Sequence, residues 1–226
     1  MINKKLEPSL LAFDFPNINE QLLEYQKIGI DTIHYDIIDP NYAQTKQPYY
    51  LEHIFPILEK GFYVNVHVMA KDPSKFINDL LLINKISTLT FQYETINKEK
   101  TIQLLNLISN AGIKQGIAIK PFAKPDEYLD FLSKCKIITF MTVEPGKGGQ
   151  AFLNEAVENL KFLFEYRQKH NLSYIIEVDG GINLNTIEKV IDYADYFISG
   201  TGFVKANINE RELFLNIIGV ANEKRK

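Results

Sequence analysis

Residues 174–183, YIIEVDGGIN, decide how the rest of the sequence is interpreted. The β-branched first half predicts a buried strand that ends in Asp179 and is followed by two glycines. Asn183 is then a candidate N-cap for a helix over residues 184–193. An acid at the carboxyl end of a buried strand faces whatever lies beyond the sheet, and paired glycines let a backbone approach an anion closely. A plain turn explains an isolated Asp-Gly-Gly equally well, so the choice between a turn and a binding site depends on the rest of the chain.

Strand and helix signals alternate along the whole chain. Apolar segments predict eight strands, at 6–11, 32–38, 63–69, 88–93, 116–119, 137–143, 174–179 and 196–199. Amphipathic segments predict helices at 18–28, 50–58, 73–84, 98–111, 125–133, 153–169, 184–193 and 211–221, and 41–49 is interpreted as a polar loop. Strict alternation indicates parallel strands, and continuous apolar strands indicate burial on both faces of the sheet.

Eight strand–helix units predict an α/β fold, a single TIM (β/α)8 barrel domain over residues 1–226. The structural rival is a doubly wound open sheet. That fold usually has five or six strands, and no G-x-G-x-x-G sequence follows the first strand here.

Composition excludes several classes of function. The net charge is −3 without a basic stripe, which argues against nucleic acid as a partner. The single cysteine, Cys135, excludes an internal disulfide and a cysteine-based metal cluster. No run of 18 apolar residues occurs, so no membrane span is expected. Glu7 and Pro8 stand where a signal peptide needs an apolar core, so a cytoplasmic location is expected.

Histidines and acids occupy the ends of three predicted strands. His34 and Asp36 are two residues apart and share one face of their strand, His67 occupies the equivalent place in the next strand, and Asp179 ends the seventh. A single strand histidine is more often a satisfied core residue. Two imidazoles and two carboxylates at one level of a barrel form a neutral set for one divalent cation, with Zn, Fe, Mn and Co all suited.

The two carboxylates also suit acid–base chemistry. They can reach opposite faces of a bound substrate, so that one removes a proton and the other supplies one. A metal between them would polarise a ketone and an adjacent hydroxyl. That combination inverts a carbon next to a carbonyl group.

Glycine-rich segments follow the last three predicted strands. They are 144–150 (EPGKGGQ), 180–181 (GG) and 200–202 (GTG). Barrels often build a phosphate site from the loops after their last strands. Ordinary turn glycines are the alternative interpretation, but three such loops on neighbouring strands favour an anion site.

Five segments of the chain form one pattern in the same order and register. They are PS at 8–9, HYDIID at 34–39, HVM at 67–69, MTVEPGKGGQAF at 141–152 and EVDGGI at 177–182. Together they resemble the ribulose-phosphate 3-epimerase family. The resemblance covers nearly the whole chain. It implies a TIM barrel of the ribulose-phosphate-binding type, a homo-oligomer, and an isomerase of the pentose phosphate pathway that epimerises C3 of D-ribulose 5-phosphate and D-xylulose 5-phosphate.

The resemblance also implies roles for individual residues. The metal ligands would be His34, Asp36, His67 and Asp179. Asp36 would accept the proton and Asp179 would donate it, with the roles exchanged in the reverse direction. The substrate would be bound by Ser9, His67, Asp179, the pocket methionines Met69 and Met141, and a phosphate site of Gly146, Lys147, Gly148, Gly149, Gly180, Gly181, Gly200 and Thr201.

The sequence departs from the family pattern around this set. Residues 38–46, IDPNYAQTK, replace the usual Met-Asp-Gly-His-Phe-Val-Pro-Asn of the loop that closes over the substrate. Gln92 replaces a histidine, Lys120 replaces an asparagine, and Lys147 replaces an aromatic residue. The two lysines are either solvated loop charges, which we favour, or extra contacts to an anion.

Three alternatives to a ribulose-phosphate epimerase remain at this point. One is a hexulose-phosphate 3-epimerase of the allulose-6-phosphate type, for which the altered loop leaves room. Another is a non-catalytic barrel that binds a phosphosugar or a protein partner, against which the complete His/Asp set argues. A decarboxylase of the same superfamily is disfavoured, because its Asp-x-Lys-x-x-Asp motif would need a lysine between Asp36 and Asp39.

Overall fold

The eight predicted strands form one parallel sheet that curls into a barrel. The structure, a computed structural model, describes residues 3–44 and 51–219. The strands are β1 (Lys5–Pro8), β2 (Thr32–Ile38), β3 (Tyr63–Met69), β4 (Ile86–Gln92), β5 (Lys114–Ile119), β6 (Ile137–Met141), β7 (Ile175–Asp179) and β8 (Tyr196–Ser199). Their order in the sheet is β1-β8-β7-β6-β5-β4-β3-β2. An isolated parallel bridge between Ser9 and His34 joins the two end strands, which confirms the predicted barrel.

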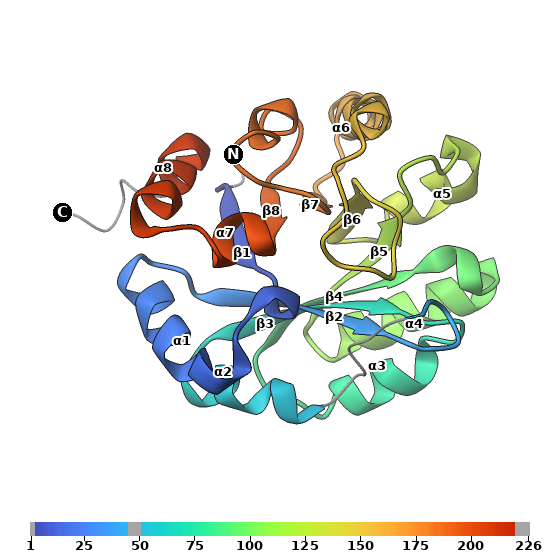
Figure 1. Ribbon diagram of the computed structural model, residues 1–226. Helices are drawn as coiled ribbons and strands as arrows, with labels where there is room; N and C mark the ends of the chain where they lie inside the picture. Colours follow the sequence, from blue (N-terminus) through green and yellow to red (C-terminus); the bar gives the residue numbers. More distant parts are fainter. Residues whose placement is uncertain (1–2, 45–50, 220–226) are drawn as a thin grey trace.

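Helices surround the strands as an outer layer (Figure 1). The α-helices are α1 (Ile18–Lys27), α2 (Phe55–Glu59), α3 (Ser74–Leu80), α4 (Lys98–Asn110), α5 (Pro125–Leu132), α6 (Val157–Lys169), α7 (Thr201–Val204) and α8 (Ile208–Ile218). Short 3-10 turns include Leu10–Ala12, Leu51–His53 and Tyr93–Thr95. Among the described residues, no helix has the length and apolar character needed to cross a bilayer.

The strand register brings the carboxyl ends of the strands to one level. Asp36 of β2 lies opposite His67 of β3, and Asp179 of β7 lies opposite Met141 of β6 and Ile198 of β8. Because side chains alternate between the two faces of a strand, residues two apart point the same way. The side chains that end these strands therefore meet at one mouth of the barrel.

The predicted helix over residues 184–193 is wrong. This segment consists of turns with one 3-10 turn, Ile187–Lys189. The Asn183 side chain accepts a hydrogen bond from the Asn185 N–H at 2.8 Å, and the Thr186 hydroxyl donates to the Gly181 carbonyl at 2.9 Å. Such bonds from short polar side chains compete with a regular helix for the backbone groups.

Other differences concern where elements begin and end. Strand β1 stops at Pro8 and β6 stops at Met141, both earlier than predicted. The helix predicted over 50–58 is divided into Leu51–His53 and α2, because Pro56 has no N–H to continue the hydrogen-bond ladder. The predicted loop residues 45–49, the first predicted helix residue Tyr50, and Val220 and Ala221 at the end of the last predicted helix lie outside the described part of the chain.

Candidate active site

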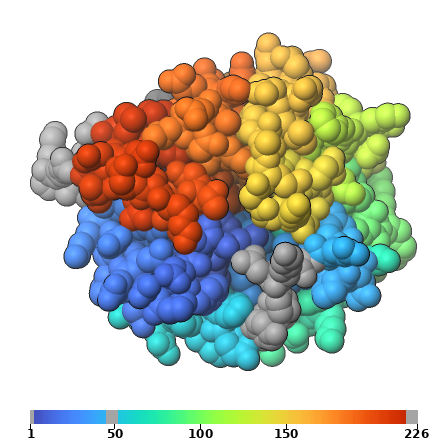
Figure 2. All heavy atoms as spheres, in the orientation of Figure 1, coloured from blue at the N-terminus to red at the C-terminus, as the bar shows by residue number. Residues whose placement is uncertain are grey.

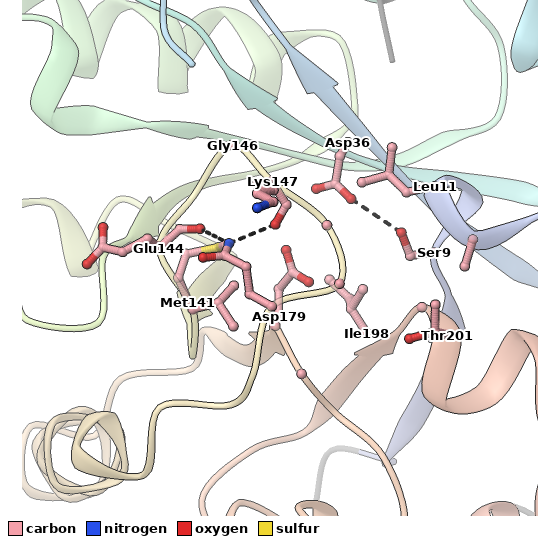
Figure 3. A pocket seen from close by; sticks show the side chains of 18 of the residues that line it. Ser9, Leu11, Asp36, Met141, Glu144, Gly146, Lys147, Asp179, Ile198 and Thr201 are labelled. Carbon is pink, nitrogen blue, oxygen red and sulfur yellow. Dashed lines mark hydrogen bonds between the residues drawn. The ribbon is translucent and has the colours of Figure 1, made fainter. Parts of the chain in front are cut away.

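The predicted histidines and aspartates converge at the carboxyl ends of β2, β3 and β7. One ligand atom from each of His34, Asp36, His67 and Asp179 lies within 4.8 Å of the others. His34 Nε2 lies 3.1 Å from Asp36 Oδ1. His67 Nδ1 lies 3.4 Å from Asp36 Oδ1 and 3.7 Å from Asp179 Oδ2. Figure 3 shows the two carboxylates entering a pocket from opposite sides.

Opposing effects of burial and charge set the proton affinities in this cluster. Burial lowers the pKa of His34, but the charge and hydrogen bond of Asp36, together with the charges of Asp179 and Glu177, raise it by more, to about 10. His67 behaves similarly, since burial is outweighed by the carboxylates of Asp179 and Asp36 and its pKa lies above the ordinary value. Burial raises the pKa of Asp36, but the charge and hydrogen bond of His34 hold it well below the usual range. The cluster therefore favours positive charge between its carboxylates.

The cluster fits a divalent cation. His67 Nδ1 is buried, faces two carboxylates, and has no hydrogen-bond partner among the described residues. A neutral imidazole would turn a lone pair toward the same point. Two imidazole nitrogens and two carboxylates are donors typical of Zn, Fe, Mn or Co. His34, Asp36, His67 and Asp179 are thus the residues that could hold a metal ion.

A pocket of about 1170 Å³ opens above the cluster. It lies in the recess between the segments coloured orange and yellow and those coloured blue in Figure 2. Ser9, Asp36, Met69, Met141 and Asp179 line it, together with the predicted phosphate residues Gly146, Lys147, Gly148, Gly149, Gly180, Gly181, Gly200 and Thr201. His34 and His67 are fully buried and do not appear among its lining residues.

The glycines of the pocket divide into two kinds. A Cβ at Gly181 would lie 2.7 Å from the Phe152 nitrogen, and one at Gly146 would lie 2.3 Å from Ala43 Cβ. Those glycines are needed because neighbouring chain segments approach closely. Added Cβ atoms at Gly148 and Gly200 would meet neighbours at 3.7 Å or more. A ligand therefore has room to approach the backbone at Gly148 and Gly200.

Sequence comparison agrees with the geometry. A sequence model of the Ribulose-phosphate 3 epimerase family matches residues 5–204. The chain belongs to this family.

Named relatives resemble the chain over most of their length. Ribulose-phosphate 3-epimerase of Mycoplasma genitalium is 36% identical over 216 residues, which cover 94% of this chain and 96% of the relative. The enzyme of the same name from Schizosaccharomyces pombe is 31% identical over 220 residues, with 93% and 91% covered. Among solved structures, a tryptophan synthase alpha-subunit from Pyrococcus furiosus covers 98% of each chain with a TM-score of 0.65 at 14% identity. That likeness concerns the fold alone.

The two lysines that depart from the epimerase family pattern have different surroundings. Lys120 Nζ lies 3.0 Å from Glu94 Oε1, so it is neither a free solvated charge nor a residue of the main pocket. Lys147 is exposed and lines the pocket beside the glycines. Only Lys147 is therefore placed where it can meet a bound anion.

Sequence reasoning missed a polar layer beneath the cluster. Glu7, Asn65 and Glu177 each precede a site residue by two positions, so they point into the barrel one level lower. Asn65 Nδ2 donates to Glu7 Oε2 at 2.6 Å and also to Glu177, and Thr139 donates to Glu177 at 2.8 Å. Burial raises the pKa of Glu7, and burial with the Glu7 charge raises that of Glu177 to about 7. Their spacing of two residues from Ser9, His67 and Asp179 was the signal in the sequence that could have predicted this polar layer.

Proposed function

We propose that the pocket is the active site of a metal-dependent ketose-phosphate 3-epimerase that interconverts D-ribulose 5-phosphate and D-xylulose 5-phosphate. The observation that carries this proposal is the placement of Asp36 and Asp179 on opposite sides of one pocket, joined by His67 at 3.4 and 3.7 Å. Membership of the epimerase family supports it. One divalent cation, Zn, Fe, Mn or Co, would be held by His34, Asp36, His67 and Asp179.

The two aspartates would move the proton. Asp36 takes the C3 proton from one face of the substrate and Asp179 returns one to the other face, and the roles exchange in the reverse direction. Ser9 Oγ donates to Asp36 Oδ2 at 3.3 Å, which orients the carboxylate that receives the proton. A bound cation would polarise the ketone and the neighbouring hydroxyl and so stabilise the enediolate.

The phosphate would lie at the opposite edge of the pocket from the proton transfer. Backbone approach is open at Gly148, Gly149 and Gly200. Lys147 adds a positive charge beside them, and Thr201 supplies a hydroxyl. Met69 and Met141 line the apolar part of the pocket, which suits the carbon skeleton of a sugar.

A hexulose phosphate is the second candidate substrate. Pro40 and Gln44, from the segment that departs most from the epimerase family pattern, line the same pocket. Pro40 and Gln44 are therefore placed to select the length of the sugar. A homo-oligomer and a cytoplasmic location stay predictions of the sequence.

Coupled assays of the purified, cation-loaded protein test the proposal. One arm supplies D-ribulose 5-phosphate and detects D-xylulose 5-phosphate, and the other supplies D-allulose 6-phosphate and detects its C3 epimer. We expect turnover in the first arm, with a higher kcat/KM than in the second. Preference for the hexulose phosphate would favour the second candidate. Saturable binding of both sugars without turnover would identify a non-catalytic binding barrel.

A further inference from the structure

Gln92 connects the buried cluster to the surface of the barrel. It ends β4, is fully buried, and its amide lies 3.2 Å from His67 Nε2. In the orientation that satisfies both neighbours, the amide oxygen accepts from His67 Nε2–H and the amide nitrogen donates to Glu94 Oε2 at 3.0 Å. The neutral imidazole of His67, which is the form that binds a cation, then carries its proton on Nε2 and turns the Nδ1 lone pair toward Asp36 and Asp179.

The Glu94 carboxylate determines this orientation. A carboxylate only accepts hydrogen bonds, so it draws the NH2 group of Gln92 and turns the amide oxygen toward His67. The opposite orientation would place two acceptors face to face at Glu94. It would also direct an N–H at His67 Nε2 and move the imidazole proton to Nδ1, where a cation needs a lone pair.

Two further donors hold the carboxylate in place. Lys120 Nζ lies 3.0 Å from Glu94 Oε1, and the Tyr42 hydroxyl donates to the same oxygen at 3.3 Å. Burial and the Glu94 charge raise the pKa of Tyr42, so this hydroxyl stays a donor. The Glu94 side chain is 23% exposed and that of Lys120 is 39% exposed. Glu94 is thus a surface-accessible acid that is anchored on one side and contacts the buried amide on the other.

We propose that Glu94 is a positioning residue that fixes the His67 tautomer through Gln92 and thereby preorganises Nδ1 to bind a cation. The inference rests on the proposed function, because it takes His67 as a metal ligand. It also gives Lys120 a role, since that lysine pairs with Glu94 and does not line the substrate pocket.

Equilibrium Co²⁺ binding, measured by competition with a chelator, tests this positioning without reference to turnover. Glu94→Gln is expected to lower Co²⁺ affinity about tenfold, the lower end for partners of metal-bound histidines. Gln92→Leu should lower it similarly. Gln92→His should restore near-wild-type affinity, because one ring nitrogen can accept from His67 while the other donates to Glu94. Glu127→Gln is the matched control, since Glu127 and Glu94 line one small second pocket but Glu127 makes no hydrogen bond to the Gln92 amide.

A double-mutant cycle tests whether the effect passes through Gln92. In the Gln92→Leu background, Glu94→Gln should cause no further loss of Co²⁺ affinity. A full additional tenfold loss would overturn the proposal, as would unchanged affinity in folded Glu94→Gln. His67→Ala separates the two ideas. If His67→Ala loses Co²⁺ binding while Glu94→Gln binds normally, the positioning role of Glu94 is overturned but His67 stays a metal ligand. If both variants bind Co²⁺ normally, His67 is not a ligand, and the positioning role of Glu94 is overturned as well.

Discussion

His34 Nε2 lies 3.1 Å from Asp36 Oδ1, and both side chains are buried at the end of β2. Burial lowers the pKa of His34, but Asp36, together with the charges of Asp179 and Glu177, raises it to about 10, so the cation-free imidazole is positively charged at neutral pH. The imidazole must lose this proton before Nε2 can bind a metal ion. Protons and divalent cations therefore compete for one position.

The first prediction follows from this competition. Co²⁺ affinity should rise with pH by at least about tenfold per unit between about pH 6 and pH 8, because one proton leaves His34 as the ion binds. The measurement is chelator competition, corrected for titration of the chelator itself. Constant affinity across this range would show that no protonated imidazole is displaced.

A second prediction concerns the exposed charge in the phosphate loop. Lys147→Met should raise KM for the phosphorylated sugar about three- to tenfold with little change in kcat, since a charged contact that is exposed to water is weaker than a buried one. Lys114→Met is the control, because Lys114 begins β5 at the opposite end of the barrel. Steady-state kinetics at two salt concentrations should show the KM difference shrink as salt rises. Equal KM values would place the phosphate away from Lys147.

The third prediction concerns the buried acid below the metal cluster. Burial and the Glu7 charge raise the pKa of Glu177 to about 7, so the folded protein keeps a proton that the unfolded chain releases near its ordinary value of 4.5. The folded state binds more protons between these values, so this group's contribution to stability is full below about pH 4.5 and is lost as pH rises toward 7. The loss amounts to roughly 3 kcal/mol at most.

Glu177→Gln tests this linkage because it keeps the size of the side chain but cannot ionise. Urea unfolding of the cation-free protein from about pH 4.5 to pH 7.5 should show a flatter decline in stability for the variant. Glu188→Gln, at an exposed position, should follow the wild-type curve. Parallel curves for wild type and Glu177→Gln would show that Glu177 titrates normally in the folded protein.

The barrel was predictable because its strand signals are local. The bounds of β2, β3 and β8 agree with the predicted 32–38, 63–69 and 196–199. The helix predicted over 184–193 was wrong because the apolar spacing of this segment suits a helix, whereas the Asn183 and Thr186 side chains form hydrogen bonds with nearby backbone groups. Short-range side-chain bonds of this kind leave no mark in the apolar periodicity.

The polar contacts behind the site were harder to foresee. Asn65 joins Glu7 to Glu177 across 58 and 112 residues of sequence, and the link from Gln92 to Glu94 depends on how one amide is turned. Barrel strands are covered on both faces, so a polar strand residue does not reveal which face it occupies. The register of neighbouring strands and the closure of the barrel determine that face, and both are defined only when all eight strands are assembled.

The last prediction concerns the two acids that face the pocket from opposite sides. Asp36→Asn and Asp179→Asn should each lower epimerisation by at least about 100-fold, the lower end for a positioned acid or base. Asp79→Asn, at an exposed position of α3, should leave the rate unchanged. Metal content must be measured beside each rate, because both acids are also proposed ligands.

The sharper measurement of the two-acid mechanism is deuterium incorporation at C3 in D2O, since each acid exchanges only the proton on its own face. A variant that keeps its cation should label one epimer without converting it to the other. Full epimerisation by cation-loaded Asp179→Asn would contradict the two-acid mechanism, because the second face would then receive its proton from another group.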